Sequence, residues 1–274
     1  MNHKIGFLAI SAMLAFASCK DNKESEQETQ TEETVTTPTI NYTVTNVLPH
    51  DTNAFTEGFL MHDGKLYEST GATEELPQTR SLFGEVDLKT GKIVTKAELD
   101  RKAYFGEGIV FLNDKVYQLT YQTKVGFIYD AKTFKRLGQF TFPSKEGWGM
   151  TTDGKSLIMS DGTNTLTWLD PENFHTVKTV FVTNEQGAVQ LVNELEYING
   201  FIYANIYTTA VIIKIDPATG KVVGKMDMAP IAIEARNKYP QSLEMNGIAY
   251  DSTTKKVLVT GKMWPHIYEI SLPL

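Results

Sequence analysis

Short apolar runs separated by turn sequences recur five times along the chain. The copies contain "EGFLMHDGKLYESTG" (57–71), "YFGEGIVFLNDKVYQLTYQ" (104–122), "EGWGMTTDGKSLIMSDG" (146–162), "NELEYINGFIYANIYTT" (193–209) and "NGIAYDSTTKKVLVTGKMW" (246–264). In four copies an Asp-Gly, Asn-Asp or Asn-Gly pair separates two apolar runs. Such pairs favour type I′ turns, which require positive φ at both central residues. Each copy therefore predicts a hairpin of two short strands.

A third run follows in most copies and ends in a reverse-turn sequence, as in "EVDLKTGK" (85–92), "IYDAKTFK" (128–135), "WLDPENFHTVK" (168–178) and "KIDPATGK" (214–221). A fourth run then closes the unit. A repeat of roughly 40 to 50 residues with four antiparallel strands has the size of a propeller blade. The pattern predicts an all-β fold, a five-bladed β-propeller.

The two ends of this pattern complement each other. The fifth copy ends after "HIYEISLPL" (266–274), one strand short, whereas "NYTVTNVL" (41–48) alternates and precedes the first copy. We expect this N-terminal strand to complete the last blade, because pairing it there removes an exposed edge and closes the ring. The segment "PIAIEARNKYPQSLEMNG" (230–247) interrupts the repeat. Its first part is expected to be a short helix, within an insertion over one mouth of the channel.

The N-terminus has the features of an export signal. Residues 1–18 have a basic start, a short apolar run and small residues before Cys19. This is typical of a signal peptide, and a cysteine directly after "FAS" resembles a bacterial lipoprotein cleavage site. We expect a lipidated Cys19, an acidic disordered tether over 19–39 and a propeller domain over 40–274. The alternative is ordinary secretion with an incidental cysteine. The lipid would place the domain on the periplasmic, outer-membrane or cell-surface side.

The composition narrows the function. The chain has 274 residues and a net charge of −7, which argues against a nucleic-acid partner, and nothing indicates more than a monomer. It has no G-x-S-x-G, H-E-x-x-H, P-loop or dinucleotide motif. The five histidines have no metal-like spacing, and the single cysteine belongs to the export signal. No metal or cofactor is therefore predicted.

Polar residues open the first strand of each repeat. The inner strands of a propeller line its channel, so these openings should meet at one mouth. The group comprises Glu57, Glu107, Glu146, Asn193 with Glu194, and Asn246. Glu107 lies between two glycines, which permit close approach of the backbone. Two roles remain open for these side chains: a shared pocket, or capping of backbone N–H groups where the blades converge.

Motifs in all five repeats resemble one known family. They include "FTEGF" (55–59), "LYESTG" (66–71), "FGEGI" (105–109), "YQLTY" (117–121), "EGWGMTTDG" (146–154), "SDGTNTLTWLDP" (160–171), "VNELEYINGFIYANIY" (192–207), "NGIAYD" (246–251) and "VTGKMWPHIYEI" (259–270). From about residue 41 to 272 the chain is similar to the plant-type glutaminyl cyclotransferases. The resemblance implies a five-bladed propeller that converts an N-terminal glutamine of peptides or proteins to pyroglutamate and releases ammonia.

The resemblance also implies roles for individual residues. The acid/base glutamate of the family falls on Glu107, and the other catalytic positions on Asn193 and Lys262. The substrate-binding positions fall on Phe55, Glu57, Phe105, Tyr121, Trp148 and Tyr207. Three of them depart from the family pattern: Tyr121 and Tyr207 stand where tryptophan is usual, and Glu57 where glutamine is usual.

Two other functions remain as alternatives. Some propellers hold a calcium ion in the channel and hydrolyse lactones, and hard oxygen ligands for such an ion are available in Glu57, Glu107, Asn193 and Asn246. The third possibility is a tethered propeller that binds peptides or glycans without catalysis. A chelator would abolish the lactonase and spare the cyclase.

Overall fold

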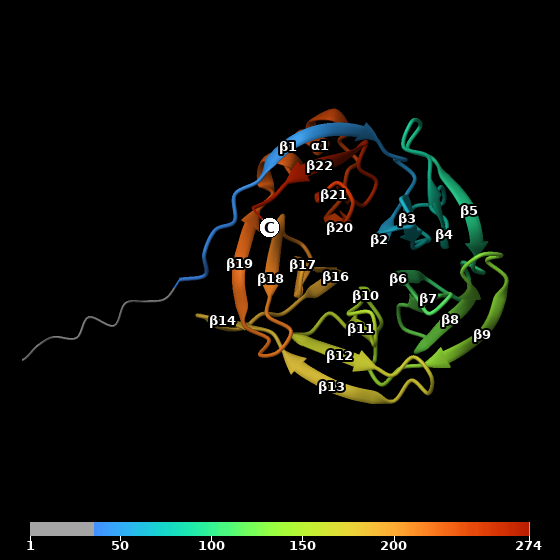
Figure 1. Cartoon of the computed structure of the whole chain (residues 1–274). Helices are drawn as coiled ribbons and strands as arrows, with labels where there is room; N and C mark the ends of the chain where they lie inside the picture. Colours follow the sequence, from blue (N-terminus) through green and yellow to red (C-terminus); the bar gives the residue numbers. More distant parts are fainter. Residues whose placement is uncertain (1–35, 274) are drawn as a thin grey trace, which may run out of the picture. The chain divides into compact units, whose positions relative to one another are not determined.

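The computed structural model describes residues 36–273, in which five four-stranded antiparallel sheets surround a central channel (Figure 1). This confirms the five-bladed propeller. The predicted signal peptide, Cys19 and most of the tether lie outside the described residues.

Each blade runs from an inner strand at the channel to an outer strand at the rim. Blade one contains β2 (Thr56–His62), β3 (Lys65–Thr70), β4 (Leu82–Val86) and β5 (Ile93–Glu98). Blade two contains β6 (Gly106–Leu112), β7 (Lys115–Thr120), β8 (Val125–Asp130) and β9 (Arg136–Thr141). Blade three contains β10 (Met150–Thr152), β11 (Leu157–Ser160), β12 (Thr165–Leu169) and β13 (Thr176–Phe181).

The remaining blades complete the ring. Blade four contains β16 (Val192–Ile198), β17 (Phe201–Ile206), β18 (Val211–Ile215) and β19 (Val222–Asp227). Blade five contains β20 (Met245–Asp251), β21 (Lys256–Gly261), β22 (His266–Ser271) and β1 (Thr43–Pro49). A small hairpin of β14 (Thr183–Asn184) and β15 (Gly187–Ala188) precedes blade four.

The N-terminal strand closes the ring as predicted. In blade five, β1 pairs antiparallel with β22, from Thr43 opposite Ser271 to Pro49 opposite His266 (Figure 1). Residues just before β1 also contact the propeller, because Lys225 of β19 exchanges backbone hydrogen bonds with Pro38 and Ile40. The N-terminal segment therefore contacts blade four before it enters blade five.

The hairpin turns have the backbone that their sequences demand. Asp63 and Gly64 have φ values of 48° and 72°, and Asn199 and Gly200 have 48° and 89°. Positive φ at both central positions is the signature of a type I′ turn, which matches the right-handed twist of the strands. These turns fix the register of the inner hairpins and leave the opposite strand ends free for other roles.

Five apolar clusters fill the five seams between neighbouring blades. Consecutive inner-strand residues point to opposite seams: Phe59 packs toward blade five, and Leu60 toward blade two. Ile109 and Val110 repeat this arrangement in blade two. Because each inner strand is covered on both faces, it has a continuous apolar run rather than strict alternation.

The interruption of the repeat forms helix α1 (Ala229–Lys238), as predicted, with a proline in its first turn. The position over the channel mouth was wrong: Ile231 and Ala235 of the helix are buried in the apolar cluster between blades four and five. No helix residue lines the pocket described below. The segment after the helix contacts the backbone of one pocket residue, since Leu243 and Glu244 exchange backbone hydrogen bonds with Lys262.

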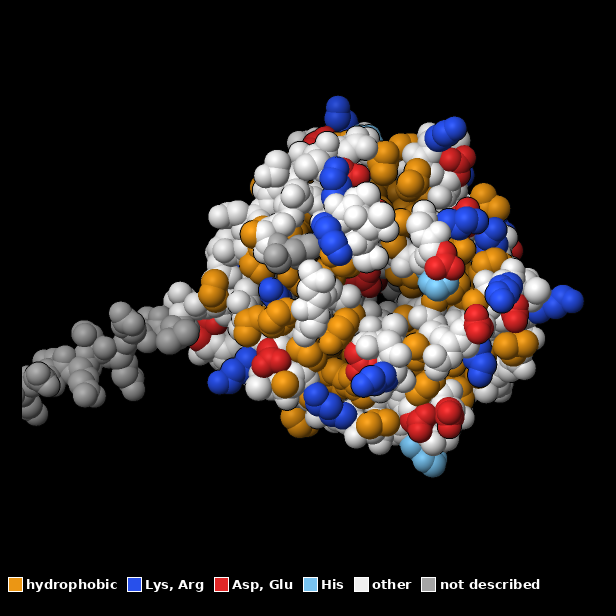
Figure 2. Space-filling model, viewed as in Figure 1, with side chains coloured by type: hydrophobic (Ala, Val, Ile, Leu, Met, Phe, Trp, Pro, Cys, Tyr) orange, Lys and Arg blue, Asp and Glu red, His pale blue; other side chains and the backbone are white. Residues whose placement is uncertain are grey.

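The face seen in Figure 2 carries acidic and basic side chains interspersed around the ring, with a hollow at its centre. Within residues 36–273, no helix is both long and apolar enough to span a bilayer.

Candidate active site

A β-bulge lies near the start of four inner strands. The pairing with the second strand shifts between Thr56 and Gly58, Gly106 and Ile109, Val192 and Leu195, and Met245 and Ile248. A bulge leaves an unpaired residue and turns its side chain away from the regular pleat. The residues inside these bulges include Glu57, Glu107, Asn193 and Asn246.

Trp148 takes the corresponding position in blade three. It precedes Gly149 as Glu57 precedes Gly58, and both glycines lie against the next inner strand. A Cβ atom on Gly58 would lie 2.8 Å from the Ile109 nitrogen, and one on Gly149 would lie 2.2 Å from the Asn193 carbonyl oxygen. Only glycine fits at these contacts, so the inner strands converge tightly at this end of the channel.

The prediction that Glu146 opens the third inner strand into the shared pocket was wrong. The strand register places Trp148 there instead, and Glu146 lies two residues earlier. The Glu146 carboxylate accepts hydrogen bonds from Trp148 Nε1 at 2.9 Å and from Gln122 Nε2 at 2.9 Å. Glu146 thereby fixes the orientation of the indole rather than lining the pocket.

A second set of pocket residues comes from the turns between the second and third strands. In blades two to five each of these turns has four residues (121–124, 161–164, 207–210 and 262–265). Their first residues are equivalent in the repeat, and three of them line the pocket: Tyr121, Tyr207 and Lys262. In blade one the equivalent is Gly71, where a Cβ atom would lie 2.0 Å from Cζ of Phe105. The Phe105 ring thus occupies the space that the missing side chain leaves.

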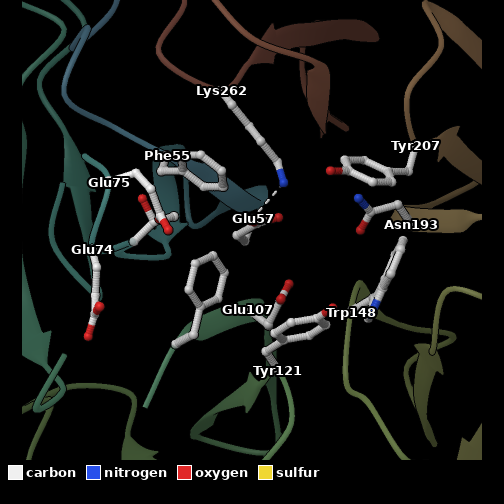
Figure 3. A pocket seen from close by; sticks show the side chains of 12 residues that line it. Phe55, Glu57, Glu74, Glu75, Glu107, Tyr121, Trp148, Asn193, Tyr207 and Lys262 are labelled. Carbon is white, nitrogen blue, oxygen red and sulfur yellow. Dashed lines mark hydrogen bonds and ion pairs between the residues drawn. The ribbon is translucent and has the colours of Figure 1, made fainter. Parts of the chain in front are cut away.

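These two sets surround a cavity of about 410 Å³ at one mouth of the channel (Figure 3). The structure brings together all nine predicted residues: Phe55, Glu57, Phe105, Glu107, Tyr121, Trp148, Asn193, Tyr207 and Lys262. Sequence reasoning missed Thr73, Glu74 and Glu75, which lie in the long loop between β3 and β4. Asn246 does not line the cavity and is fully buried behind Glu57.

Glu57 is held by a buried ion pair. Lys262 Nζ donates to Glu57 Oε1 at 2.7 Å, and Asn246 Nδ2 donates to Glu57 Oε2 at 3.1 Å. The ammonium group also lies 4.5 Å from the centre of the Phe55 ring, a favourable cation–π distance. Both carboxylate oxygens of Glu57 are therefore engaged by the protein itself.

The Glu107 carboxylate differs from Glu57 in having no partner. The residue is 4% exposed, and its side-chain oxygens have no hydrogen bond to any residue of the described chain. Burial, followed by the negative charge of Glu57, raises the pKa of Glu107 well above its ordinary value, although Lys262 opposes the shift. In Figure 3 the carboxylate points into the cavity. A buried carboxyl group without a partner that faces a cavity is a candidate for proton transfer to a ligand.

The ion pair is electrostatically linked to Glu107. Burial raises the pKa of Glu57 to about 7, against the lowering effects of Lys262 and Asn246. For Lys262, burial lowers the pKa, but the charges of Glu57 and Glu107 outweigh it and the pKa is raised. Lys262 therefore remains an ammonium group, and any change in Glu57 is felt at Glu107.

Asn193 supplies an amide at the far wall. Its side chain is 2% exposed, and Oδ1 has no hydrogen-bond partner among the described residues. Figure 3 shows it beside Tyr207, pointing into the cavity. A buried polar atom without a partner is costly, and a substrate group in the cavity would satisfy it.

Aromatic rings form the walls between these polar groups. Phe55 and Phe105 meet edge to face with ring centres 5.8 Å apart, and Phe105 continues to Tyr121 at 5.9 Å. On the other side Trp148 and Tyr207 meet edge to face at 5.4 Å. The rings thus form apolar walls around the polar groups of the cavity.

A buried histidine supports the turn that carries Lys262. The two ring nitrogens of His50 face acceptors: Nδ1 lies 2.8 Å from the Trp264 carbonyl oxygen, and Nε2 lies 3.0 Å from Glu68 Oε1. Burial lowers the pKa of His50, but the charge and hydrogen bond of Glu68 outweigh it and the pKa is raised. Thr56 Oγ1 also donates to Glu68, at 2.7 Å. This network ties the start of β2 to the segment that follows Lys262.

The alternative capping role holds for Glu194. Its two carboxylate oxygens accept the backbone N–H groups of Phe59 at 3.2 Å and Ile248 at 2.9 Å. Glu194 thus joins blade four to blades one and five across the channel, and it does not line the cavity. Some of the polar residues that open the inner strands therefore line the pocket, and Glu194 caps backbone N–H groups instead.

No group of three or more His, Cys, Asp or Glu side chains within residues 36–273 is arranged to hold a metal ion. The positive charge next to Glu57 comes from Lys262. The geometry defines a propeller with a buried carboxyl group of raised pKa, an ammonium and an amide in one aromatic-walled cavity.

Comparisons with known proteins agree with this class. The family model described as glutamine cyclotransferase matches residues 10–272. The chain is 36% identical over 226 residues to the glutaminyl-peptide cyclotransferase of Arabidopsis thaliana, covering 82% of this chain and 69% of that protein. It also resembles the crystal structure of the Myxococcus xanthus glutaminyl cyclase, with a TM-score of 0.78 and 32% identity over 86% of this chain and 98% of that one. The chain belongs to the glutamine cyclotransferase family.

Proposed function

We propose that this protein converts the N-terminal glutamine of peptides or proteins to pyroglutamate and releases ammonia. The observation that carries the proposal is the buried, unpartnered carboxyl group of Glu107, which faces an aromatic-walled cavity and has a raised pKa. The names of the relatives from Arabidopsis and Myxococcus support the same reaction.

The reaction requires positioning and one proton carrier. The α-amino nitrogen of the substrate attacks the γ-carboxamide carbon of the same glutamine. The new C–N bond closes the five-membered ring, and the bond from that carbon to the amide nitrogen breaks. The net products are a lactam and ammonia, and no water is consumed. Because the nucleophile belongs to the substrate, holding the side chain folded back supplies much of the acceleration. The Phe55–Phe105 pair and the Trp148–Tyr207 pair are the walls that would hold it.

Glu107 is suited to carry the proton. The substrate amine has an ordinary pKa near 8 and must be neutral to attack. The raised pKa of Glu107 makes it a better acceptor for the proton of the substrate ammonium than an exposed carboxylate would be. The protonated Glu107 then donates to the departing nitrogen. One carboxyl group therefore serves as base and as acid within a single turnover.

The neighbouring polar groups would stabilise the substrate oxygen atoms. Lys262 and the Asn193 amide line the same cavity and present donors to a carboxamide or peptide carbonyl oxygen. Glu57 is already bound by Lys262 and Asn246. Its role is therefore to hold the ammonium group in place, in preference to gripping the substrate amine.

The calcium-dependent lactonase has less support from this geometry. Glu57 would be a principal ligand, yet its oxygens are engaged by an ammonium and an amide. A binding protein without catalysis has no use for a proton carrier, and it would not release ammonia from a glutamine peptide. The cyclotransferase is the function that uses the ion pair and the free carboxyl group together.

The test is incubation of the purified protein with a glutamine-initiated peptide, followed by mass spectrometry. We expect loss of one ammonia from this peptide, with or without EDTA, and no loss from the same peptide with an acetylated amine. Failure of the free peptide to react, or a reaction that EDTA stops, would contradict the proposed function.

The location of the protein is part of the proposal. The basic and apolar N-terminus ending at Cys19 supports export and lipidation of that cysteine. We expect Cys19→Ser to move the protein from the membrane fraction to the soluble fraction without a change in the activity of the folded domain. A wild-type protein that already fractionates as soluble would contradict this proposal.

A further inference from the structure

The loop between β3 and β4 breaks the repeat at the pocket. It has eleven residues (71–81), whereas the equivalent turns of the other four blades have four. Three of its residues line the cavity, namely Thr73, Glu74 and Glu75. A long loop inserted at a pocket in an otherwise regular scaffold is a common carrier of specificity.

The loop has a defined conformation. The Arg101 guanidinium donates to three of its carbonyl oxygens, those of Thr73 at 2.6 Å, Pro77 at 3.0 Å and Thr79 at 3.1 Å. Inside the loop, Thr79 Oγ1 donates to the Leu76 carbonyl at 2.7 Å. Glu74 and Glu75 are therefore held at the rim of the cavity by a fixed backbone.

The negative charge of the cavity lies mainly at its rim. The lining contains the carboxyl groups of Glu57 and Glu107, whose pKa values are raised by burial, those of Glu74 and Glu75 at the rim, and the ammonium of Lys262. The ammonium is already paired with Glu57. Glu74 and Glu75 are exposed, and neither has an ion-pair or hydrogen-bond partner for its carboxylate among the described residues. The guanidinium of Arg101, which contacts this loop, is occupied by the loop carbonyls. The two rim carboxylates are therefore available to a cationic group of a ligand.

The positions of Glu74 and Glu75 relative to Glu107 and Asn193 indicate the direction in which a bound peptide would leave the cavity. The partnerless, buried side chains of Glu107 and Asn193 mark the inner end, where the first residue of a substrate would lie. In Figure 3, Glu74 and Glu75 lie on the Phe55 side, away from Asn193 and Tyr207. A chain that leaves the cavity on this side passes the Phe55 ring and then reaches the two carboxylates.

We propose that the 71–81 loop selects peptides with a lysine or arginine close behind the N-terminal glutamine. This inference rests on the proposed function. The aliphatic stem of such a side chain would pack on Phe55 and Phe105, and its charged end would reach Glu74 and Glu75. Long basic side chains cover apolar surface in this way while their charge remains at a wet rim. An acidic residue at the same place is repelled.

The experiment compares kcat/KM for three glutamine-initiated peptides that carry lysine, alanine or glutamate at the second position. A second set of three peptides carries the same changes at the third position. In wild type at low salt we expect the lysine peptide to exceed the glutamate peptide by about tenfold, since exposed ion pairs have modest strength. The ratio should fall toward one as salt is added, because the rim is exposed.

Two double variants make the test specific. Glu74→Gln with Glu75→Gln should reduce the ratio of lysine to glutamate peptide to about twofold or less. Asp63→Asn with Asp114→Asn makes the same charge change in hairpin turns with positive φ, a conformation that asparagine tolerates, and should keep the wild-type ratio. Charge reversal at Glu74 and Glu75 to lysine should invert the preference.

The outcomes separate this inference from the proposed function. Turnover of the alanine peptide without a charge preference in wild type overturns the inference and leaves the cyclotransferase intact. An unchanged ratio in the Glu74→Gln, Glu75→Gln variant also overturns it. If no glutamine peptide reacts, the proposed function and the inference both fail.

Discussion

Carboxyl groups with raised pKa values occur at both ends of the channel, the buried Glu107 and the half-buried Glu196. At the pocket end, Glu107 borders a cavity of about 410 Å³ and its carboxylate has no hydrogen bond to the described chain. Toward the other end, Glu196 borders a cavity of about 230 Å³, and its Oε1 accepts the Tyr250 N–H at 2.8 Å. Burial raises the pKa of both groups, to about 8 for Glu196.

The comparison shows that a raised pKa does not by itself distinguish a catalytic group from a structural one. Glu196 closes a gap between inner strands by accepting a backbone donor. Glu107 lacks such a donor and has instead an ammonium, an amide and aromatic walls around it. The unsatisfied hydrogen-bonding capacity marks the pocket end as the place where a ligand completes the structure.

The largest effect should follow from breaking the ring that both ends share. A protein beginning at residue 51 lacks β1 and exposes the edge of β22. We expect it to aggregate or remain unfolded, as judged by circular dichroism and gel filtration. Removal of residues 20–35 is the control and should leave the melting temperature unchanged. A soluble, folded protein without β1 would contradict the closure of the ring.

Next in size is the loss of the pocket ammonium. Lys262→Met removes the donor and leaves Glu57 and Glu107 as buried carboxylates without a compensating charge. We expect kcat on a glutamine peptide to fall by about tenfold to a thousandfold. The matched change Lys256→Met breaks an ion pair with Glu269 outside the pocket and should leave kcat within about twofold of wild type. Equal effects of the two changes would argue against a role for Lys262.

A smaller effect is expected at Glu57. Glu57→Gln restores the residue usual in the family and keeps an oxygen that can accept from Lys262. The negative charge of Glu57 raises the pKa of Glu107, so its removal lowers that pKa. The acidic limb of the pH–rate profile should then move to lower pH, with kcat at its optimum within about threefold of wild type. A shift to higher pH would contradict the coupling.

The smallest effect concerns the other end of the channel. The pKa of Glu196 is raised from its ordinary value to about 8 in the folded protein. At a pH between these two values, the folded protein keeps a proton on Glu196 and the unfolded chain has lost it. The free energy of unfolding that Glu196 contributes therefore falls as the pH rises from the ordinary pKa of a glutamate toward 8. Glu196→Gln removes this dependence, so the melting temperature of the variant should decline less between pH 5 and pH 8.5 than that of wild type. A steeper decline in the variant would reverse the sign of this argument.

The repeat predicted the fold and the polar strand openings that reach the pocket, whereas the aromatic positions and Lys262 were assigned from the family resemblance. Turn pairs such as Asp63-Gly64 define the hairpins, and the polar residue at each strand opening then falls at the opposite end. Glu146 was misplaced because Glu146-Gly147 and Trp148-Gly149 both fit the pattern of a residue followed by glycine. Only the strand register, with Gly149 against Asn193, decides between them.

Glu74 and Glu75 were missed for a different reason. Their loop differs from the others in length, and this becomes visible only when the ends of β3 and β4 are known. The hydrogen bonds from Arg101 to the Thr73, Pro77 and Thr79 carbonyls, which give the loop its shape, involve backbone atoms and have no sequence signature.

The most direct test compares the two carboxyl groups in one assay. Glu107→Gln and Glu196→Gln make the same chemical change at the two ends of the channel, and kcat is measured with a glutamine-initiated peptide between pH 6 and pH 9. The account predicts that Glu107→Gln lowers kcat by about 10²–10⁴-fold, as expected for loss of general acid–base catalysis, and that Glu196→Gln stays within about threefold of wild type. Equal rates in the two variants, or a larger loss in Glu196→Gln, would contradict it.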